Sequence, residues 1–434
     1  MMNKKTKKIK INTYVIRTLV FSLVLFAVFF IGLLFPLRPS FSESEKRELA
    51  KFPKFTFESF FNGSYFSDIG TWYSDTYPGR EQLIGLNANI KELYGFSGQG
   101  QVHGEVVEGD DIPDEYVEPE THDETTTRKP LIVEDLNTQT LGAVFVAGNT
   151  GYEYYNFVKD YADHYIGAMN DIGDNLAPHN IKVYNMIVPT SIAITLPDNY
   201  KNTIKSDDQE KAINYMMSGM NSNVIKVPVM DTLLDHRTEY VYFRTDHHWT
   251  ALGAYYSYDK FCEISGIPAR TLSQYKQVEF DGFLGTFYND TGKSPALGKT
   301  SDTVFAYMPS ENAKMVYTDK KGNKISWAII NDVSKYSQSL KYSTFIAGDN
   351  PFTEITNPDI TDGSAIVVVK ESFGNAFVPF LVDNFSKVYV IDYRYYNGSV
   401  SDFAIKNNVE NVLYLNNISA TRNKWLVSRI EQTL

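Results

Sequence analysis

The sequence holds two short segments whose side chains could together carry out acyl transfer. One is KESFGN at residues 370–375, and the other is TDHHW at residues 245–249. A serine hydroxyl is a weak nucleophile, so it needs a base within hydrogen-bonding reach and a third group that orients the base. In this chain Ser372 is the candidate nucleophile, His248 the candidate base and Asp246 the candidate orienting group.

Ser372 lies between an apolar run and a stretch with helical spacing. A strand, a sharp turn and a helix start expose a nucleophile and offer free N–H groups to a developing oxyanion. Gly374 permits the close approach of another backbone. The backbone N–H of Ser372, with that of Gly374 or the side-chain amide of Asn375, can donate to the oxyanion. The alternative is that Ser372 only caps the helix, which is a common role of serine.

The Asp-x-His spacing of Asp246 and His248 lets one loop supply both the base and its orienting carboxylate. His247 points elsewhere in an extended geometry, so we expect a supporting or structural role for it. Two alternatives remain: Asp246 caps the following helix, or the three residues together bind a metal ion. Metal sites usually need further ligands, and the chain has no HExxH or His-x-His motif. We therefore expect no metal and no cofactor.

The elements that must position these segments are strands of an α/β sheet. Apolar runs predict strands, and helical spacing predicts helices between them. Strands are expected at 143–147, 182–188, 224–229, 365–369, 388–392 and 412–415, and helices at 152–176, 208–220, 249–264, 376–385 and 403–409. This alternation predicts a parallel sheet with helices on both faces, and sites in such folds lie at the carboxyl ends of the strands. Both reactive segments follow predicted strands, KESFGN the run at 365–369 and TDHHW a short run at 241–244, so they should converge.

The chain as a whole divides by composition. A basic tail at 1–17 precedes a transmembrane anchor at 18–36 and a helical or extended region at 37–96. Residues 97–131 are acidic and poor in large apolar side chains, which predicts a flexible linker. The α/β domain is expected at 132–434, with a β-rich insertion at about 270–362, where turn signals replace the alternation.

The predicted anchor contains TLVFSLVLFAVFFIGLLF, which carries no charge and approaches the length that spans a bilayer. Basic residues precede it, so the positive-inside rule predicts a cytoplasmic N-terminus and an extracytoplasmic domain. A cleaved signal peptide is the alternative, but its apolar region is usually shorter and ends at small residues. We expect a single-pass protein of the cell membrane.

Charge and cysteine content exclude two classes. The net charge is −11, and nucleic-acid binding demands a positive surface. Cys262 is the single cysteine, so no intrachain disulfide forms and the disulfide-stapled secreted class is excluded.

The motifs TDHHW, ESFGNAFVPFL, VIDYR and SEKRELAKFP resemble the DHHW protein family, itself similar to the SGNH-type alginate O-acetyltransferase accessory proteins. The resemblance implies an SGNH-hydrolase-like domain in which the Asp-x-His loop precedes the serine. It also implies the roles of nucleophile for Ser372, base for His248 and orienting group for Asp246. Glu371 replaces the aspartate that is typical before the serine in these families. The sequence alone therefore does not decide whether this side chain supports the serine turn.

These observations favour a membrane-anchored, extracytoplasmic serine O-acyltransferase or esterase, most simply O-acetyl, that acts on a cell-envelope or exported polysaccharide. Such a domain cannot reach cytoplasmic acetyl-CoA, and the resemblance points to a membrane-bound O-acyltransferase as the partner. The alternative is a non-catalytic glycan-binding or scaffold protein of the cell envelope with the same fold. Distances of about 2.6–3.2 Å between the three side chains would favour the enzyme.

Overall fold

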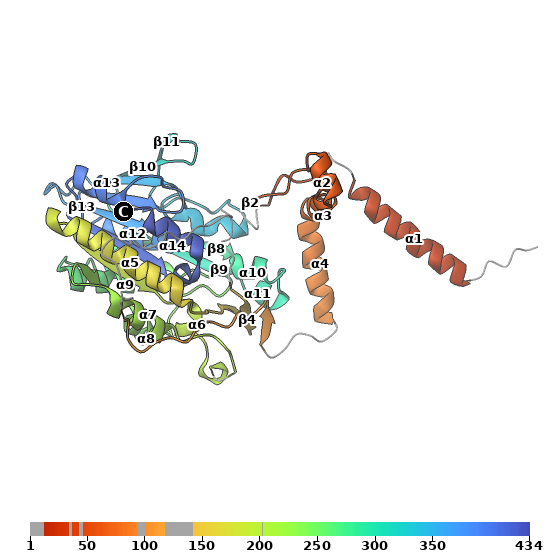
Figure 1. Ribbon diagram of the computed structural model, residues 1–434, viewed down its shortest axis with the longest axis horizontal. Helices are drawn as coiled ribbons and strands as arrows, with labels where there is room; N and C mark the ends of the chain where they lie inside the picture. Colours follow the sequence, from red (N-terminus) through yellow and green to blue (C-terminus); the bar gives the residue numbers. More distant parts are fainter. Residues whose placement is uncertain (1–12, 34–36, 43–46, 94–99, 118–141, 202) are drawn as a thin grey trace, which may run out of the picture. The chain divides into compact units, whose positions relative to one another are not determined.

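The computed structural model describes residues 13–33, 37–42, 47–93, 100–117, 142–201 and 203–434 (Figure 1). The chain divides into two compact units, Met1–Leu93 and Tyr94–Leu434.

The first unit is mostly helical. It contains α1 (Thr13–Ile31), α2 (Phe57–Phe61), α3 (Ser64–Asp75) and α4 (Arg80–Leu93), and a short antiparallel pair of β1 (Phe41–Ser42) and β2 (Arg47–Glu48). In α1, the window Tyr14–Ile31 is long and apolar enough to cross a membrane, and its side chains are not buried in the protein. The helix begins five residues before the predicted anchor, and residues 34–36 of that anchor lie outside the described residues.

The second unit is built around an eight-stranded sheet in the order β11-β10-β12-β14-β13-β15-β6-β7. Five neighbouring strands, from β14 to β7, run parallel, as the alternation predicted. Their bounds are β6 Lys182–Val188, β7 Val224–Lys226, β13 Ala365–Lys370, β14 Lys387–Asp392 and β15 Asn411–Asn417. Every residue of β13 is buried, which explains its uninterrupted apolar run.

The stretch expected as a β-rich insertion extends this sheet. Its strands β10 (Lys314–Thr318), β11 (Lys324–Trp327) and β12 (Phe352–Thr356) are added antiparallel beyond β14. The same stretch holds the separate pair β8 (Lys276–Phe283) and β9 (Asp302–Met308), with α10 (Thr286–Asp290) and α11 (Pro295–Gly298) between them. The sheet is therefore mixed, with a parallel part that carries the predicted site.

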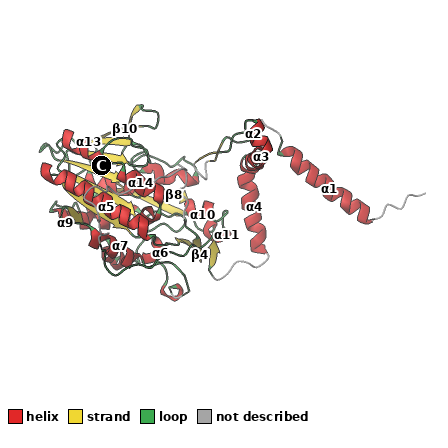
Figure 2. Cartoon of the chain, viewed as in Figure 1, coloured by secondary structure: helices red, strands yellow, loops and turns green. Residues whose placement is uncertain are grey.

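Helices cover both faces of the sheet. On one face α5 (Lys159–Leu176) packs against α13 (Val400–Lys406) and α14 (Lys424–Glu431), and α5 and α14 lie side by side (Figure 1). A second group consists of α9 (Ala251–Ser265), α12 (Gly374–Leu381) and α8 (Met230–Asp235). The remaining helices of this unit include α6 (Ser191–Ile194) and α7 (Gln209–Gly219), and Figure 2 shows how helix and strand alternate around the sheet.

A small three-stranded antiparallel sheet lies apart from the main one. It consists of β3 (Gln101–His103), β4 (Val144–Ala147) and β5 (Thr150–Glu153). The helix predicted from residue 152 begins only at Lys159, because residues 150–153 pair with β4 instead. Strand β3 falls inside the stretch expected as a flexible linker, and residues 118–131 of that stretch lie outside the described residues.

Candidate active site

Ser372 lies in a tight turn between β13 and α12. The strand ends at Lys370 and the helix begins at Gly374, whose backbone N–H donates to the carbonyl oxygen of Glu371 at 3.0 Å. Phe373 occupies the N-cap position of α12, and no side chain caps this helix. The Ser372 hydroxyl therefore does not have the capping role that was the alternative.

Asp246 and His248 lie in an irregular loop that follows β7 and α8 and precedes α9, so the prediction of a strand directly before this loop was wrong. The loop is closed by an isolated antiparallel bridge between Tyr242 and Trp249. Thr250 is the N-cap of α9, and its side chain accepts from the backbone N–H of Gly253. Asp246 is thus not the cap of the following helix.

The structure brings the three side chains together. His248 Nε2 lies 2.7 Å from Ser372 Oγ, and His248 Nδ1 lies 2.6 Å from Asp246 Oδ1. A carboxylate can only accept, so Nδ1 donates to Asp246 and Nε2 is left to accept from the Ser372 hydroxyl. Asp246 and His248 are buried, and Ser372 is partly exposed. The arrangement places a hydroxyl, a base and an orienting carboxylate in one hydrogen-bonded row.

Asp246 is held by more than the histidine. Its Oδ2 accepts from the backbone N–H of Thr286 at 2.8 Å and from the Thr286 hydroxyl at 3.0 Å, and its Oδ1 also accepts from the backbone N–H of His248 at 3.0 Å. A Cβ at Gly285 would overlap the Asp246 carboxylate. Glycine at position 285 therefore lets the start of α10 approach the carboxylate closely.

Asp302 fixes the loop that carries Asp246 and His248. Its carboxylate is buried and accepts from Thr245 N and Thr245 Oγ1, each at 2.7 Å, from Tyr240 OH at 2.6 Å and from Arg244 Nε at 3.0 Å. Charge-assisted hydrogen bonds of this kind are stronger than neutral ones. The sequence reasoning missed Asp302 and Thr286, since neither has a local motif and both lie far along the chain.

Glu371 ties the serine turn to the end of β15. Its Oε2 accepts from the backbone N–H of Phe373 at 3.1 Å and lies 3.3 Å from Ser372 Oγ. Its Oε1 accepts from the backbone N–H of Asn417 at 2.9 Å. Glutamate at position 371, where the family typically has aspartate, therefore supports the serine turn. Its longer side chain reaches the ends of β13 and β15 at once.

Tyr342, in the 3-10 helix Gln338–Thr344, was also missed by the sequence reasoning. Its ring stacks on His248, with centroids 4.0 Å apart and planes at 14°. Its hydroxyl donates to the carbonyl oxygen of Ser372 at 3.0 Å. Burial, together with the charge of nearby carboxylates such as Asp246, raises the pKa of Tyr342 well above its usual value, so the phenol stays protonated and can donate.

The predicted oxyanion donors are partly engaged within the protein. The N–H of Gly374 bonds to Glu371 O, and Asn375 Nδ2 donates to Asp349 Oδ1 at 2.9 Å. An amide nitrogen carries two hydrogens, so Asn375 keeps one donor. Within the described part of the chain, the backbone N–H of Ser372 has no acceptor.

A buried ionic cluster lies behind Asn375. Lys370 Nζ is 3.1 Å from Asp392, and Arg394 bridges Asp392 at 2.7 Å and Asp349 at 3.0 Å. Burial opposes the charge of Arg394, but the two carboxylates outweigh it and raise its pKa well above the usual value. The cluster orders the carboxylate of Asp349 to which Asn375 donates.

Asp246, His247 and His248 also offer ligand atoms within 4.8 Å of one another, the metal arrangement considered above. Two ligands at about 2.1 Å from one tetrahedral ion would lie about 3.4 Å apart. Asp246 Oδ1 and His248 Nδ1 are 2.6 Å apart, which is a hydrogen-bond distance. The His247 ring lies 3.9 Å from the His248 ring and packs against it. The geometry fits a hydrogen-bonded pair better than a ligand pair.

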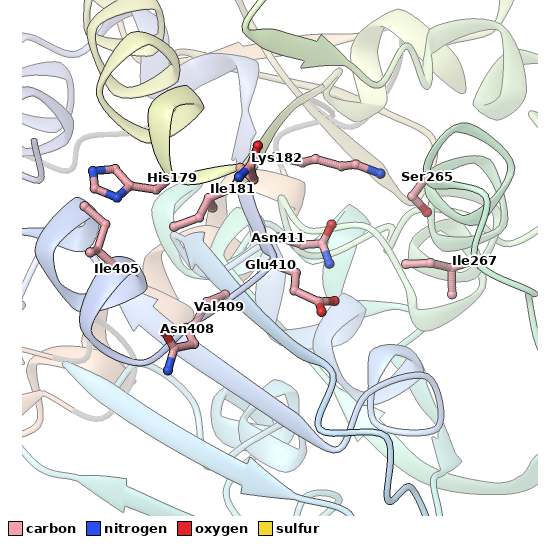
Figure 3. Close-up of a pocket in the computed structure, with 11 residues that line it drawn as sticks. His179, Ile181, Lys182, Ser265, Ile267, Ile405, Asn408, Val409, Glu410 and Asn411 are labelled. Carbon is pink, nitrogen blue, oxygen red and sulfur yellow. The ribbon is translucent and has the colours of Figure 1, made fainter.

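A separate cavity of about 680 Å³ lies at the opposite end of the strands (Figure 3). Its lining includes Lys182 and Asn411, the first residues of β6 and β15, together with His179 and Glu410. Ser372 follows the last residue of β13, so this cavity is distinct from the site at the carboxyl ends.

The family profile described as DHHW protein matches residues 45–135 and 132–391. The chain belongs to the DHHW family. A DHHW family protein from Eubacterium siraeum is 30% identical, with a TM-score of 0.60, and the match covers 67% of this chain and 96% of that one. No curated protein sequence matches this chain significantly.

Two other solved structures are similar to this member of the DHHW family. Bacillus cereus PatB1, solved with a sulfonyl adduct, is 20% identical with a TM-score of 0.56, over 65% of this chain and 97% of that one. The O-acetyltransferase domain of Pseudomonas putida AlgJ is 11% identical with a TM-score of 0.37, over 68% of this chain and 100% of that one. The likeness to PatB1 shows a shared fold, as the SGNH-like resemblance implied.

Proposed function

We propose that this DHHW protein is a serine O-acyltransferase or esterase, most simply one for O-acetyl groups, that acts on a cell-envelope or exported polysaccharide. The observation that carries the proposal is the hydrogen-bonded row Ser372–His248–Asp246, with distances of 2.7 and 2.6 Å. These distances fall in the range that activates a serine nucleophile.

In the proposed reaction, Ser372 Oγ attacks an acyl carbonyl carbon while its proton passes to His248 Nε2. The new C–O bond forms as the carbonyl electrons move to oxygen, and the Ser372 N–H, with Asn375, supports that oxyanion. Collapse of the intermediate breaks the bond to the leaving alkoxide, which takes the proton from His248. A sugar hydroxyl or water then attacks the acyl-serine by the same route in reverse.

The location of the reaction follows from α1. We propose that α1 anchors the chain in the cell membrane, with the second unit on the extracytoplasmic side. The polysaccharide acceptor and a membrane-bound acyl donor protein belong to the same proposal, because cytoplasmic acetyl-CoA cannot reach an exported serine. The net charge of −11 is unsuited to nucleic acid.

The test is turnover and labelling of the purified full chain. A sulfonyl fluoride should add to Ser372, as seen by intact mass and peptide mapping, and p-nitrophenyl acetate should be hydrolysed. Ser372→Ala should abolish labelling and lower turnover by about 10³- to 10⁶-fold. Ser401→Ala, in the buried face of α13, is the matched control and should retain both.

Retained labelling and turnover in Ser372→Ala would overturn the mechanism. Glycan retention without turnover, unaffected by Ser372→Ala or His248→Ala, would instead identify the non-catalytic glycan-binding protein. Transfer to an oligosaccharide in competition with water distinguishes a transferase from an esterase.

A further inference from the structure

All five phenylalanines of residues 55–66 in the first unit are exposed, although phenylalanine is a strongly apolar side chain. The exposed fractions are 75% for Phe57, 81% for Phe61, 57% for Phe66, 53% for Phe55 and 40% for Phe60. Soluble proteins rarely expose a contiguous apolar patch without using it.

These five side chains form one group, named here the phenylalanine patch. The ring centroids of Phe60 lie 5.3 Å from Phe66, 5.5 Å from Phe61 and 5.7 Å from Phe55. Those of Phe55 and Phe57 lie 5.7 Å apart. The patch is therefore continuous over α2 and the start of α3.

The backbone beneath the patch is well defined. Thr56 and Ser59 form a capping box at the start of α2, with the Ser59 N–H donating to Thr56 Oγ1 at 3.1 Å. Gly63 has φ 84°, a left-handed conformation that favours glycine and turns the chain from α2 into α3. This corner brings Phe66 beside Phe60, so the patch is a preorganised surface.

The end of α3 and the segment that follows it are hydrogen-bonded to the last turns of the apolar helix α1. Tyr77 OH donates to Val28 O at 2.7 Å, and Tyr73 OH donates to Phe29 O at 3.0 Å. Arg38, just beyond α1, places its guanidinium 3.6 Å from the centre of the Trp72 ring. Tyrosine, tryptophan and arginine at the end of a spanning helix are typical of the membrane–water interface.

We propose that the phenylalanine patch inserts into the headgroup–acyl boundary of the bilayer that α1 spans. The occupant is the lipid surface itself, because the patch is held on a helix bonded to the last turns of α1. Exposed Lys54, just before the patch, adds attraction to anionic headgroups, whereas Lys51 is paired with Glu48 at 3.0 Å. The proposal rests on α1 as a membrane anchor and goes beyond the acyl chemistry.

The depth of the patch can be measured with one fluorophore on the full chain in nanodiscs of phosphatidylcholine and phosphatidylglycerol. The native Cys262 is buried, and burial raises the pKa of its thiol to about 12, so it resists labelling. Phe61→Cys then carries the environment-sensitive label NBD. Asp68→Cys, an exposed polar position of α3, is the matched control.

NBD at position 61 should emit at shorter wavelength than at position 68. Compared with the label at position 68, the label at position 61 should be quenched at least threefold more by doxyl-labelled lipid. It should be quenched less by iodide in the aqueous phase. Equal iodide quenching at both positions would overturn the patch proposal and leave the surface to a protein partner or a second copy. Extraction of the unlabelled chain by alkaline carbonate would instead overturn the role of α1 as a membrane anchor. Ester turnover of the same samples tests the catalytic proposal separately.

Discussion

Ser372 lies at the end of a fully buried strand, whereas Asp246 and His248 lie in a loop without regular secondary structure. The serine is positioned by the parallel sheet and by Glu371, which spans two strand ends. The base and its carboxylate are positioned by Asp302 and Thr286, which belong to β9 and α10. The difference shows that the stretch at 270–362 is part of what assembles the site, in addition to extending the sheet.

Among variants that keep the serine, the largest effect is expected from Asp246→Asn, which removes the carboxylate that orients His248. The amide can offer an N–H to His248 Nδ1, which favours the tautomer whose Nε2 cannot accept the serine proton. We expect kcat/KM for p-nitrophenyl acetate to fall about 10⁴-fold with the fold retained. A loss below tenfold would mean that Asp246 does not orient the base.

Asp302→Asn should have the next largest effect, although Asp302 lies outside the reacting row. The amide has one acceptor oxygen in place of two, so donors of Thr245 and Arg244 lose a partner and the loop shifts. We expect kcat to fall about 100-fold with KM little changed, because small misplacements of catalytic groups are costly. Asp281→Asn, an exposed aspartate of the neighbouring β8, is the control and should be neutral. Equal kcat values for Asp302→Asn and Asp281→Asn would refute the positioning role of Asp302.

Glu371→Asp tests how the serine turn is held at the end of β13. The shorter side chain cannot reach both Phe373 N and Asn417 N, so one of these hydrogen bonds is lost. At about 1.5 kcal/mol for such a bond, we expect roughly a tenfold loss of the rate of sulfonyl labelling. Glu410→Asp, exposed at the far end of the strands, should label at the parent rate. A labelling rate unchanged by Glu371→Asp would show that the sheet alone holds the turn.

Tyr342→Phe should have the smallest effect. The ring that stacks on His248 remains, and only the hydrogen bond to Ser372 O is removed. A net value near 0.7 kcal/mol predicts about a threefold loss of kcat/KM. Tyr342→Ala removes the stacking as well, so it should lose clearly more; equal losses would show that stacking contributes nothing.

The strands that carry Ser372 could be predicted from sequence because their apolar runs are local and uninterrupted. Strand β6 was predicted with its observed bounds, and β13 to within one residue. The supports of the loop could not be predicted, because Asp302 contacts Thr245 across 57 residues and no local pattern marks it. The start of α5 was misplaced for a related reason: pairing of residues 150–153 with β4 overrides their helical spacing.

The order of the strands has a consequence for how the protein is made. Strand β15 lies between β13 and β6, so the last strand of the chain separates two parts of the sheet that are synthesised earlier. Parallel pairing over such long separations is slow to form. A nascent chain that has not yet reached Asn417 lacks the strand that joins the serine side to the rest of the sheet. The hydrogen bonds that join the serine side of the sheet to β6 through β15 therefore form only after residue 417 has been synthesised.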